Sequence, residues 1–166
     1  MLKTNMSPHD ISILRKIMPI ICILVPWEVY YYIGDYSKGW GIKFSLFYAN
    51  FDSQYGNIFV DMIKQLGLLS YGGFLPSVRT ITWFVAAILC IALLVYELSK
   101  KSLELELKNS NIAAVFIACA ILTLVSSLAV WNSAFKAFPI APFFFSLGGY
   151  LLLTANDSSE KFKDNN

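Results

Sequence analysis

A run of 20 residues without a charged side chain, Ile112–Trp131, restricts the fold of this chain more than any other feature. About 20 consecutive apolar residues are enough for an α-helix to cross the hydrocarbon core of a bilayer. Hydrophobic residues make up 57% of the chain and charged residues only 14%, whereas soluble domains carry about 25% charged residues. The sequence therefore predicts an all-α membrane protein.

The apolar runs predict four transmembrane helices in a single membrane domain of residues 1–155. These spans are expected at about 11–33, 81–98, 112–131 and 137–155, with a long outer segment at 34–80 and a disordered tail at 156–166. Under this topology one side carries eight Lys and Arg residues and the other side five. Because positive charge favours the cytoplasmic side, we expect a cell-membrane protein with both termini in the cytoplasm.

The outer segment gives two local signals. Apolar and polar residues of Asn57–Leu69 separate onto opposite helical faces, which predicts an amphipathic helix at the membrane interface. Residues 42–48 alternate as in a strand, but Trp40, Phe44 and Phe47 also recur at helical spacing. Both interpretations of that stretch remain open.

Glu28 is the candidate functional residue, because an ionisable side chain inside a span is costly and is often functional. Arg79 enters the second span at the same expected boundary and is the first candidate partner, and Lys136 is the second. The pair predicts either a structural ion pair or an ion site. Pro26 has no amide hydrogen, so it leaves the carbonyl of Cys22 without its helical partner.

Aromatic residues flank the first span and follow it. Trp and Tyr are enriched at membrane–water interfaces, so the sequence predicts interfacial positions for Trp27, Tyr30, Tyr31 and Trp40. The lipid bilayer is accordingly one expected partner.

Known catalytic and metal-binding patterns are missing from the sequence. The one histidine, His9, lies outside the expected spans, and there is no P-loop, GxSxG, HExxH or CxxC pattern. The cysteines, Cys22, Cys90 and Cys119, lie within apolar runs and are expected to be buried. We therefore predict no catalytic, cofactor-binding or metal-binding residues and no enzyme activity. A net charge of +2 without a Lys/Arg cluster argues against a nucleic-acid partner.

Some motifs resemble those of known membrane proteins. Val25-Pro26-Trp27 near the end of the first span, Trp40-Gly41 soon after it, and a proline-headed last span resemble a group of small archaeal four-span membrane proteins of unknown activity. The layout alone, with a long aromatic segment between the first spans, is similar to that of claudin-like proteins, although the outer cysteine pair of claudins is missing. Neither resemblance implies an activity.

Small residues in the expected spans, such as Ala114, Ala118 and the pair Gly148-Gly149, allow close helix packing. Together with the lack of a catalytic set, they predict an accessory or scaffold subunit of a larger membrane complex, such as a respiratory or redox complex. Other membrane subunits are then expected partners. The alternative is a small transporter or ion-conducting oligomer that uses Glu28.

Overall fold

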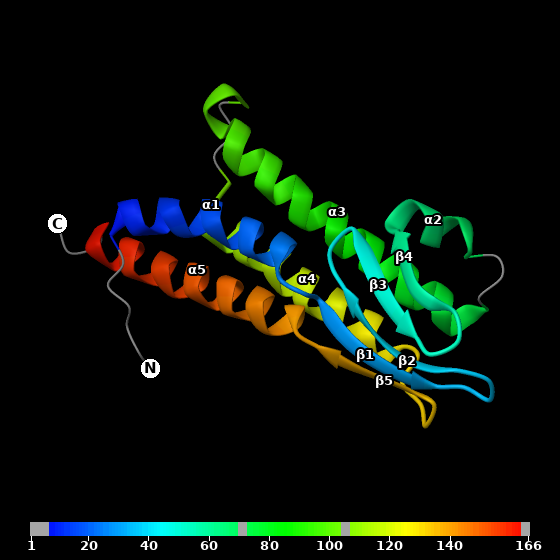
Figure 1. Ribbon diagram of the computed structural model, residues 1–166. Helices are drawn as coiled ribbons and strands as arrows, with labels where there is room; N and C mark the ends of the chain where they lie inside the picture. The colour runs from blue at the N-terminus through cyan, green and yellow to red at the C-terminus, as the bar shows by residue number, and fades with distance from the viewer. Residues whose placement is uncertain (1–6, 70–72, 104–106, 164–166) are drawn as a thin grey trace.

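A computed structural model describes residues 7–69, 73–103 and 107–163. Its elements follow the chain in the order α1 (Pro8–Leu24), β1 (Glu28–Ile33), β2 (Lys38–Lys43), β3 (Phe47–Asp52), β4 (Gly56–Asp61), α2 (Met62–Gly67), α3 (Phe74–Leu103), α4 (Asn109–Leu128), β5 (Phe135–Pro139) and α5 (Ala141–Lys163). The long helices α1, α3, α4 and α5 form a bundle, and the sheet lies at one end of it, beside the start of α3 and the end of α4 (Figure 1).

The strands form one antiparallel sheet in the order β4-β3-β2-β1-β5. The prediction of an all-α protein with four spans is therefore wrong. The first apolar run does not continue as a helix to Ile33, because Pro26 ends α1 and Val25 already has an extended backbone, with φ −68° and ψ 149°. The β-branched and aromatic residues that follow favour a strand over a helix.

The structure also differs from the prediction for the outer segment. Residues 57–61 of the expected amphipathic helix belong to the edge strand β4, and only the short α2 is helical. Asp61 accepts a hydrogen bond from the backbone N–H of Lys64 and so caps α2 at its first turn. The stretch 42–48, which periodicity left open, contains the end of β2 and the start of β3.

The expected fourth span begins as a strand. β5 pairs with β1, and α5 starts only at Ala141 and continues to Lys163, through most of the predicted disordered tail. Trp27 links the α1–β1 connection to the β5–α5 connection, because its carbonyl accepts the backbone N–H groups of Ile140 and Ala141 at 2.9 and 3.1 Å. Hydrogen bonds thus hold the two segments that connect the bundle to the sheet together at one point.

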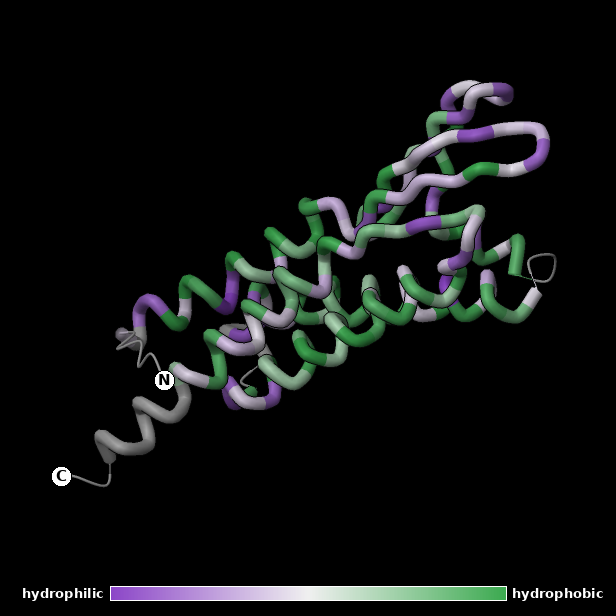
Figure 2. Tube along the Cα trace, turned by 90° about the horizontal axis from the view of Figure 1, so that it is seen from below, coloured by the Kyte–Doolittle hydropathy of each residue, from purple (hydrophilic) through white to green (hydrophobic). Residues whose placement is uncertain are grey.

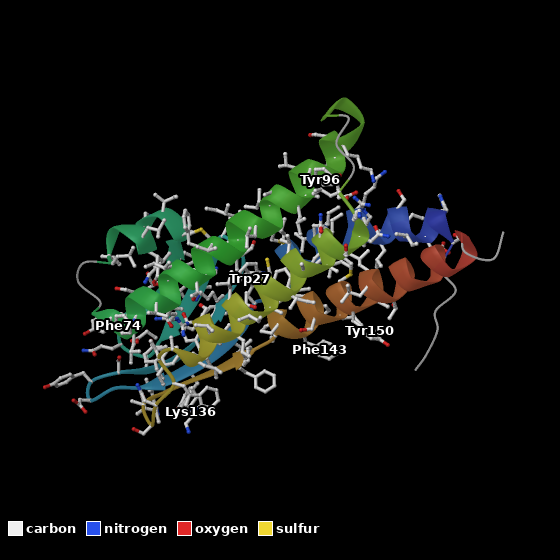
Figure 3. All side chains as sticks on the ribbon, turned by 180° about the vertical axis from the view of Figure 1, so that it is seen from behind. Trp27, Phe74, Tyr96, Lys136, Phe143 and Tyr150 are labelled. Atoms are coloured by element: carbon white, nitrogen blue, oxygen red, sulfur yellow. The ribbon has the colours of Figure 1, made fainter. Side chains whose placement is uncertain are left out.

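Among the described residues, the segments Phe74–Lys100 and Asn109–Leu128 are long and apolar enough to cross a membrane, and Ala141–Ala155 is a shorter apolar helix. The hydropathy of the chain follows the architecture, because the helices are largely hydrophobic whereas hydrophilic residues gather in the strand turns and at the opposite end of the bundle (Figure 2). Large apolar side chains also project outward, as Phe143 and Tyr150 do from α5 (Figure 3). This surface is suited to an apolar solvent.

Small side chains bring the helices into close contact. α4 packs against α3 and α5, and α1 packs against α3 and α5. Gly149 allows α5 to approach α4 closely, since a Cβ there would lie 3.2 Å from the carbonyl oxygen of Ala113. Ala86, Ala113 and Cys119 are fully buried at these contacts.

Candidate functional site

The buried ion pair between Glu28 and Arg79 connects the sheet to the bundle. Glu28 begins β1 and is 1% exposed, and its Oε1 accepts a hydrogen bond from Nη2 of Arg79 on α3. The Arg79 guanidinium also lies over the rings of Phe135 and Tyr30, at 4.7 and 5.4 Å from their centroids. The structure thus brings together the two residues that the sequence paired. Lys136 lies elsewhere, over the ring of Trp131.

Lys43, at the end of β2, is a second buried cation beside this pair. Its Nζ donates to Oγ of Ser126 at 3.1 Å, and that hydroxyl donates to the carbonyl of Arg79 at 2.8 Å. Nζ also lies 4.5 Å from the centroid of the Trp83 ring. Burial lowers the pKa of Lys43 well below its ordinary value; the Arg79 charge adds to this effect and Glu28 opposes it.

Arg79 and Lys43 line a pocket of about 560 Å³ between the sheet, the start of α3 and the end of α4. That volume is within the range of small-molecule sites. Side chains from the sheet, α2, α3 and the α4–β5 connection line it: Tyr30, Tyr32, Lys43, Tyr48, Asn50, Gln65, Leu75, Pro76, Arg79, Thr80, Trp83, Ala129, Val130, Trp131, Asn132 and Phe135. Phe74, at the start of α3, marks this end of the bundle in Figure 3.

Arg79 and Asn50 line the pocket, and each carries a buried polar atom without a hydrogen-bond partner among the described residues. These atoms are Nη1 of Arg79, which is a donor, and Oδ1 of Asn50, which is an acceptor. Oε2 of Glu28 is likewise buried without a partner there. Buried polar groups are nearly always paired, so an unpaired group at a cavity wall points to a bound water, ion or ligand.

Tyrosine hydroxyls extend the polar wall. Tyr48 donates to Oε1 of Gln65 at 3.0 Å, and the Asn50 amide donates to the hydroxyl of Tyr32 at 3.1 Å. Tyr32 in turn donates to Asp52 at the far end of β3. Burial raises the pKa of Tyr48 and of Tyr30, so both present neutral hydroxyls.

Glycines in β2 make room for the tyrosine rings. A Cβ at Gly41 would overlap the ring of Tyr30 and lie 2.7 Å from the carbonyl oxygen of Ala49, and one at Gly39 would lie 2.7 Å from Cζ of Tyr32. The two rings therefore cross β2 on the pocket side of the sheet. Any side chain at these glycines would displace them.

The predicted interfacial aromatics divide between the core and the surface. Trp27 and Tyr30 are buried, whereas Tyr31 and Trp40 are exposed on the side of the sheet away from the pocket. The indole of Trp27 donates to the carbonyl of Cys22 at 2.6 Å, which is the carbonyl that Pro26 leaves without a helical partner.

A second buried carboxylate, Glu97, lies at the opposite end of the bundle. Arg15 from α1 pairs with it at 2.7 Å and Lys100 at 3.0 Å, and Arg15 also donates to Asn109 of α4 at 3.1 Å. This cluster fastens α1, α3 and α4 together, and we assign it to structure. Sequence reasoning missed both Glu97 and Lys43 as buried charges.

No group of three or more His, Cys, Asp or Glu residues in the described chain could hold a metal ion. The cysteines are buried, and the Cys90 and Cys119 thiols lie 3.6 and 3.7 Å from the backbone carbonyl oxygens of Pro19 and Ala86. They serve as small core residues in these positions.

Comparison of the sequence with protein-family models gave no match, and comparison with curated proteins gave none either. Function resides in sites rather than in folds. The chemistry of the pocket is therefore the basis for a functional assignment.

Proposed function

We propose that this is a non-enzymatic membrane protein that binds an anionic small molecule in the pocket between the sheet and the bundle. One observation carries the proposal: Arg79 lines this pocket, and its Nη1 has no hydrogen-bond partner among the described residues. A carboxylate or phosphate oxygen would satisfy that donor, and hydrogen bonds to charged groups are the strongest class.

The charges around the pocket favour an anion. Arg79 and Lys43 line it, and Glu28 is the carboxylate that faces them. Glu28 accepts one guanidinium hydrogen bond, which leaves the other Nη of Arg79 for a second acceptor. An anion next to Lys43 would also favour its protonated form.

The lining favours binding over catalysis. As far as the structure describes it, the lining contains no histidine, cysteine, aspartate or glutamate, which are the residues that most often act as bases and nucleophiles. Glu28 and Lys43 both line a neighbouring void of about 10 Å³, which is the size of one water molecule. Transport through Glu28 stays a prediction without a specific observation in its favour.

The hydrophobic helices favour placing the pocket near a membrane surface. α3 and α4 contain the segments long enough to cross a bilayer, and the pocket lies at the start of one and the end of the other. In this arrangement the bundle lies in the bilayer and the sheet covers the pocket outside the hydrocarbon core.

The test is a ligand-dependent stability measurement in phosphatidylcholine nanodiscs. Inorganic, phenyl and dodecyl phosphate are titrated at constant ionic strength, since a ligand at 100 times its Kd stabilises the folded state by about 2.7 kcal/mol. We expect at least one of them to raise the melting temperature of the wild type but not of Lys43→Met. Lys100→Met, at the other end of the bundle, is the matched control and should respond like the wild type. No response to any of the phosphates would overturn the proposal.

An accessory role in a larger membrane assembly is the second candidate function. The face of the sheet away from the pocket exposes a set of aromatic side chains that the described chain leaves uncovered: Tyr31, Trp40, Phe59 and Phe138. Phe59 and Phe138 are 65% and 71% exposed, and aromatic residues are enriched in protein interfaces. Native gel migration after mild extraction tests this role, and a band of monomer size without co-migrating protein would contradict it.

A further inference from the structure

We propose that the ligand is an anionic amphiphile, with a phosphate or carboxylate head group held by Arg79 and Lys43 and an alkyl chain that leaves the pocket over Leu75 and Trp131. This inference rests on the proposed anion-binding function and specifies its ligand. It follows from how polar and apolar side chains are distributed around the pocket.

Polar side chains make up one part of the pocket lining. The sheet contributes hydroxyl, amide and amine groups, and α2 and α3 add further polar side chains: Tyr30, Tyr32, Lys43, Tyr48, Asn50, Gln65, Arg79 and Thr80. Arg79 and Asn50, which carry an unpaired donor and an unpaired acceptor, are both among these lining residues. A head group that accepts at one point and donates at another would satisfy both.

Apolar groups form another part of the lining. They come from the first turn of α3 and from the residues after α4: Leu75, Pro76, Ala129, Val130 and Trp131. Leu75 is 53% exposed and Trp131 47% exposed, so this part of the lining reaches the molecular surface. We name these five residues the apolar rim.

Asn132 adjoins the apolar rim, but its side-chain oxygen is already used. It accepts the backbone N–H groups of Ala134 and Phe135, both at 2.8 Å. The path from the polar wall to the surface over the apolar rim therefore presents mainly hydrocarbon, which suits an alkyl chain and gives a small hydrophilic anion nothing to bind.

The volume of the pocket agrees with a ligand of this kind. About 560 Å³ is far more space than one phosphate or carboxylate group fills. The apolar rim lies at the start of α3 and directly after the end of α4, the two helices with membrane-length apolar segments. An amphiphile dissolved in the bilayer therefore has its alkyl chain at the depth of the apolar rim when its head group meets the sheet.

The experiment compares the affinities of dodecyl phosphate and phenyl phosphate in phosphatidylcholine nanodiscs. Each methylene group buried on the apolar rim adds to affinity, so we expect dodecyl phosphate to bind at least about tenfold more tightly. The double variant Leu75→Ser/Trp131→Ser should remove most of this difference. Leu98 is an exposed leucine near the other end of α3, so Leu98→Ser is the matched control and should bind like the wild type.

Three results would overturn the inference. Equal affinities for the two phosphates would show that the alkyl chain is not recognised, although the anion-binding function would stand. A preference for dodecyl phosphate that survives both the rim variant and Lys43→Met would reflect partitioning into the bilayer. Binding of neither phosphate would overturn the inference together with the function on which it rests.

A further arm identifies the source of the amphiphile. Phosphatidylglycerol in the nanodisc, in place of added dodecyl phosphate, tests a bilayer lipid against a single-chain compound. Competition between the two at the pocket, lost in Lys43→Met, supports the proposal with a membrane lipid as ligand. Binding of dodecyl phosphate without competition supports it with a single-chain anion.

Discussion

Glu28 on β1 and Arg79 on α3 form a buried ion pair across 51 positions of the chain. The pair fixes the sheet on the end of the bundle, and it also sets the orientation of the guanidinium at the pocket. Glu28 holds one Nη of Arg79 and leaves the other unpaired. Structure and proposed binding therefore depend on the same contact.

Glu28→Gln should reduce the free energy of unfolding by about 3 kcal/mol, because it leaves the buried guanidinium without a counter-charge. Denaturant titration in detergent micelles measures the loss. The double variant Glu28→Leu/Arg79→Leu is the control, since replacing both members of a buried pair by apolar residues is often neutral. A loss below about 1 kcal/mol for the single variant, as for an exposed pair, would contradict a buried ion pair.

Gly41→Ala should displace the Tyr30 ring from the pocket wall, because the new Cβ would overlap that ring and approach the carbonyl of Ala49. We expect a loss of about 1–3 kcal/mol in stability together with weaker phosphate binding. Gly67→Ala is the matched control, since a Cβ there meets nothing within 4 Å. Equal behaviour of the two variants would exclude a packing role for Gly41.

Asp52 should give the sheet a stability that is lost in acid. Hydrogen bonds from the Tyr32 hydroxyl and from the backbone N–H groups of Tyr55 and Gln54 lower its pKa from 3.8 to about 2. The folded state therefore binds fewer protons than the unfolded state in this range, and stability is present above pH 3.8 and falls as the pH drops towards 2. Denaturant titrations across this range should show the decline in the wild type and not in Asp52→Asn. The same slope in both proteins would remove Asp52 as its source.

Lys43→Met should separate stability from binding. Burial lowers the pKa of Lys43 in the folded state, so below the ordinary value of 10.5 the unfolded state binds more protons. Lys43 therefore lowers stability at neutral pH and lowers it less as the pH rises. We expect Lys43→Met to be at least as stable as the wild type at neutral pH, with an advantage that shrinks on raising the pH, and to lose phosphate binding. A variant that is less stable at neutral pH would show that the charged amine is well paired.

The bundle could be predicted in part from the sequence, because long apolar runs have one main structural solution. The run at 112–131 lies within three residues of the observed α4 at each end. The prediction of a span at 11–33 was wrong because the first apolar run contains both a helix and a strand, and its apolar content does not change at Pro26. Tyr30, Tyr31 and Tyr32 fit a membrane boundary and a strand equally well.

The Glu28–Arg79 contact could be anticipated because Glu28 lies inside one apolar run, Arg79 precedes another at the same expected boundary, and a buried charge needs a partner. Lys43 could not be found in this way, because its burial depends on the register of β2. In that register Gly39, Gly41 and Lys43 share the pocket side of the sheet. The strand alternation after Gly39 is the signal in the sequence from which the burial of Lys43 could have been predicted.

The most direct measurement of the central claim is a solid-state ¹⁵N–³¹P contact between Arg79 and bound dodecyl phosphate. The chain contains two arginines, so arginine-selective ¹⁵N labelling gives an internal control in Arg15, which pairs with Glu97 at the other end of the bundle. We expect the phosphate ³¹P to dephase one of the two guanidinium signals, and we expect that signal to be missing from Arg79→Lys. Dephasing of neither signal, or of the Arg15 signal alone, would contradict anion binding at this pocket.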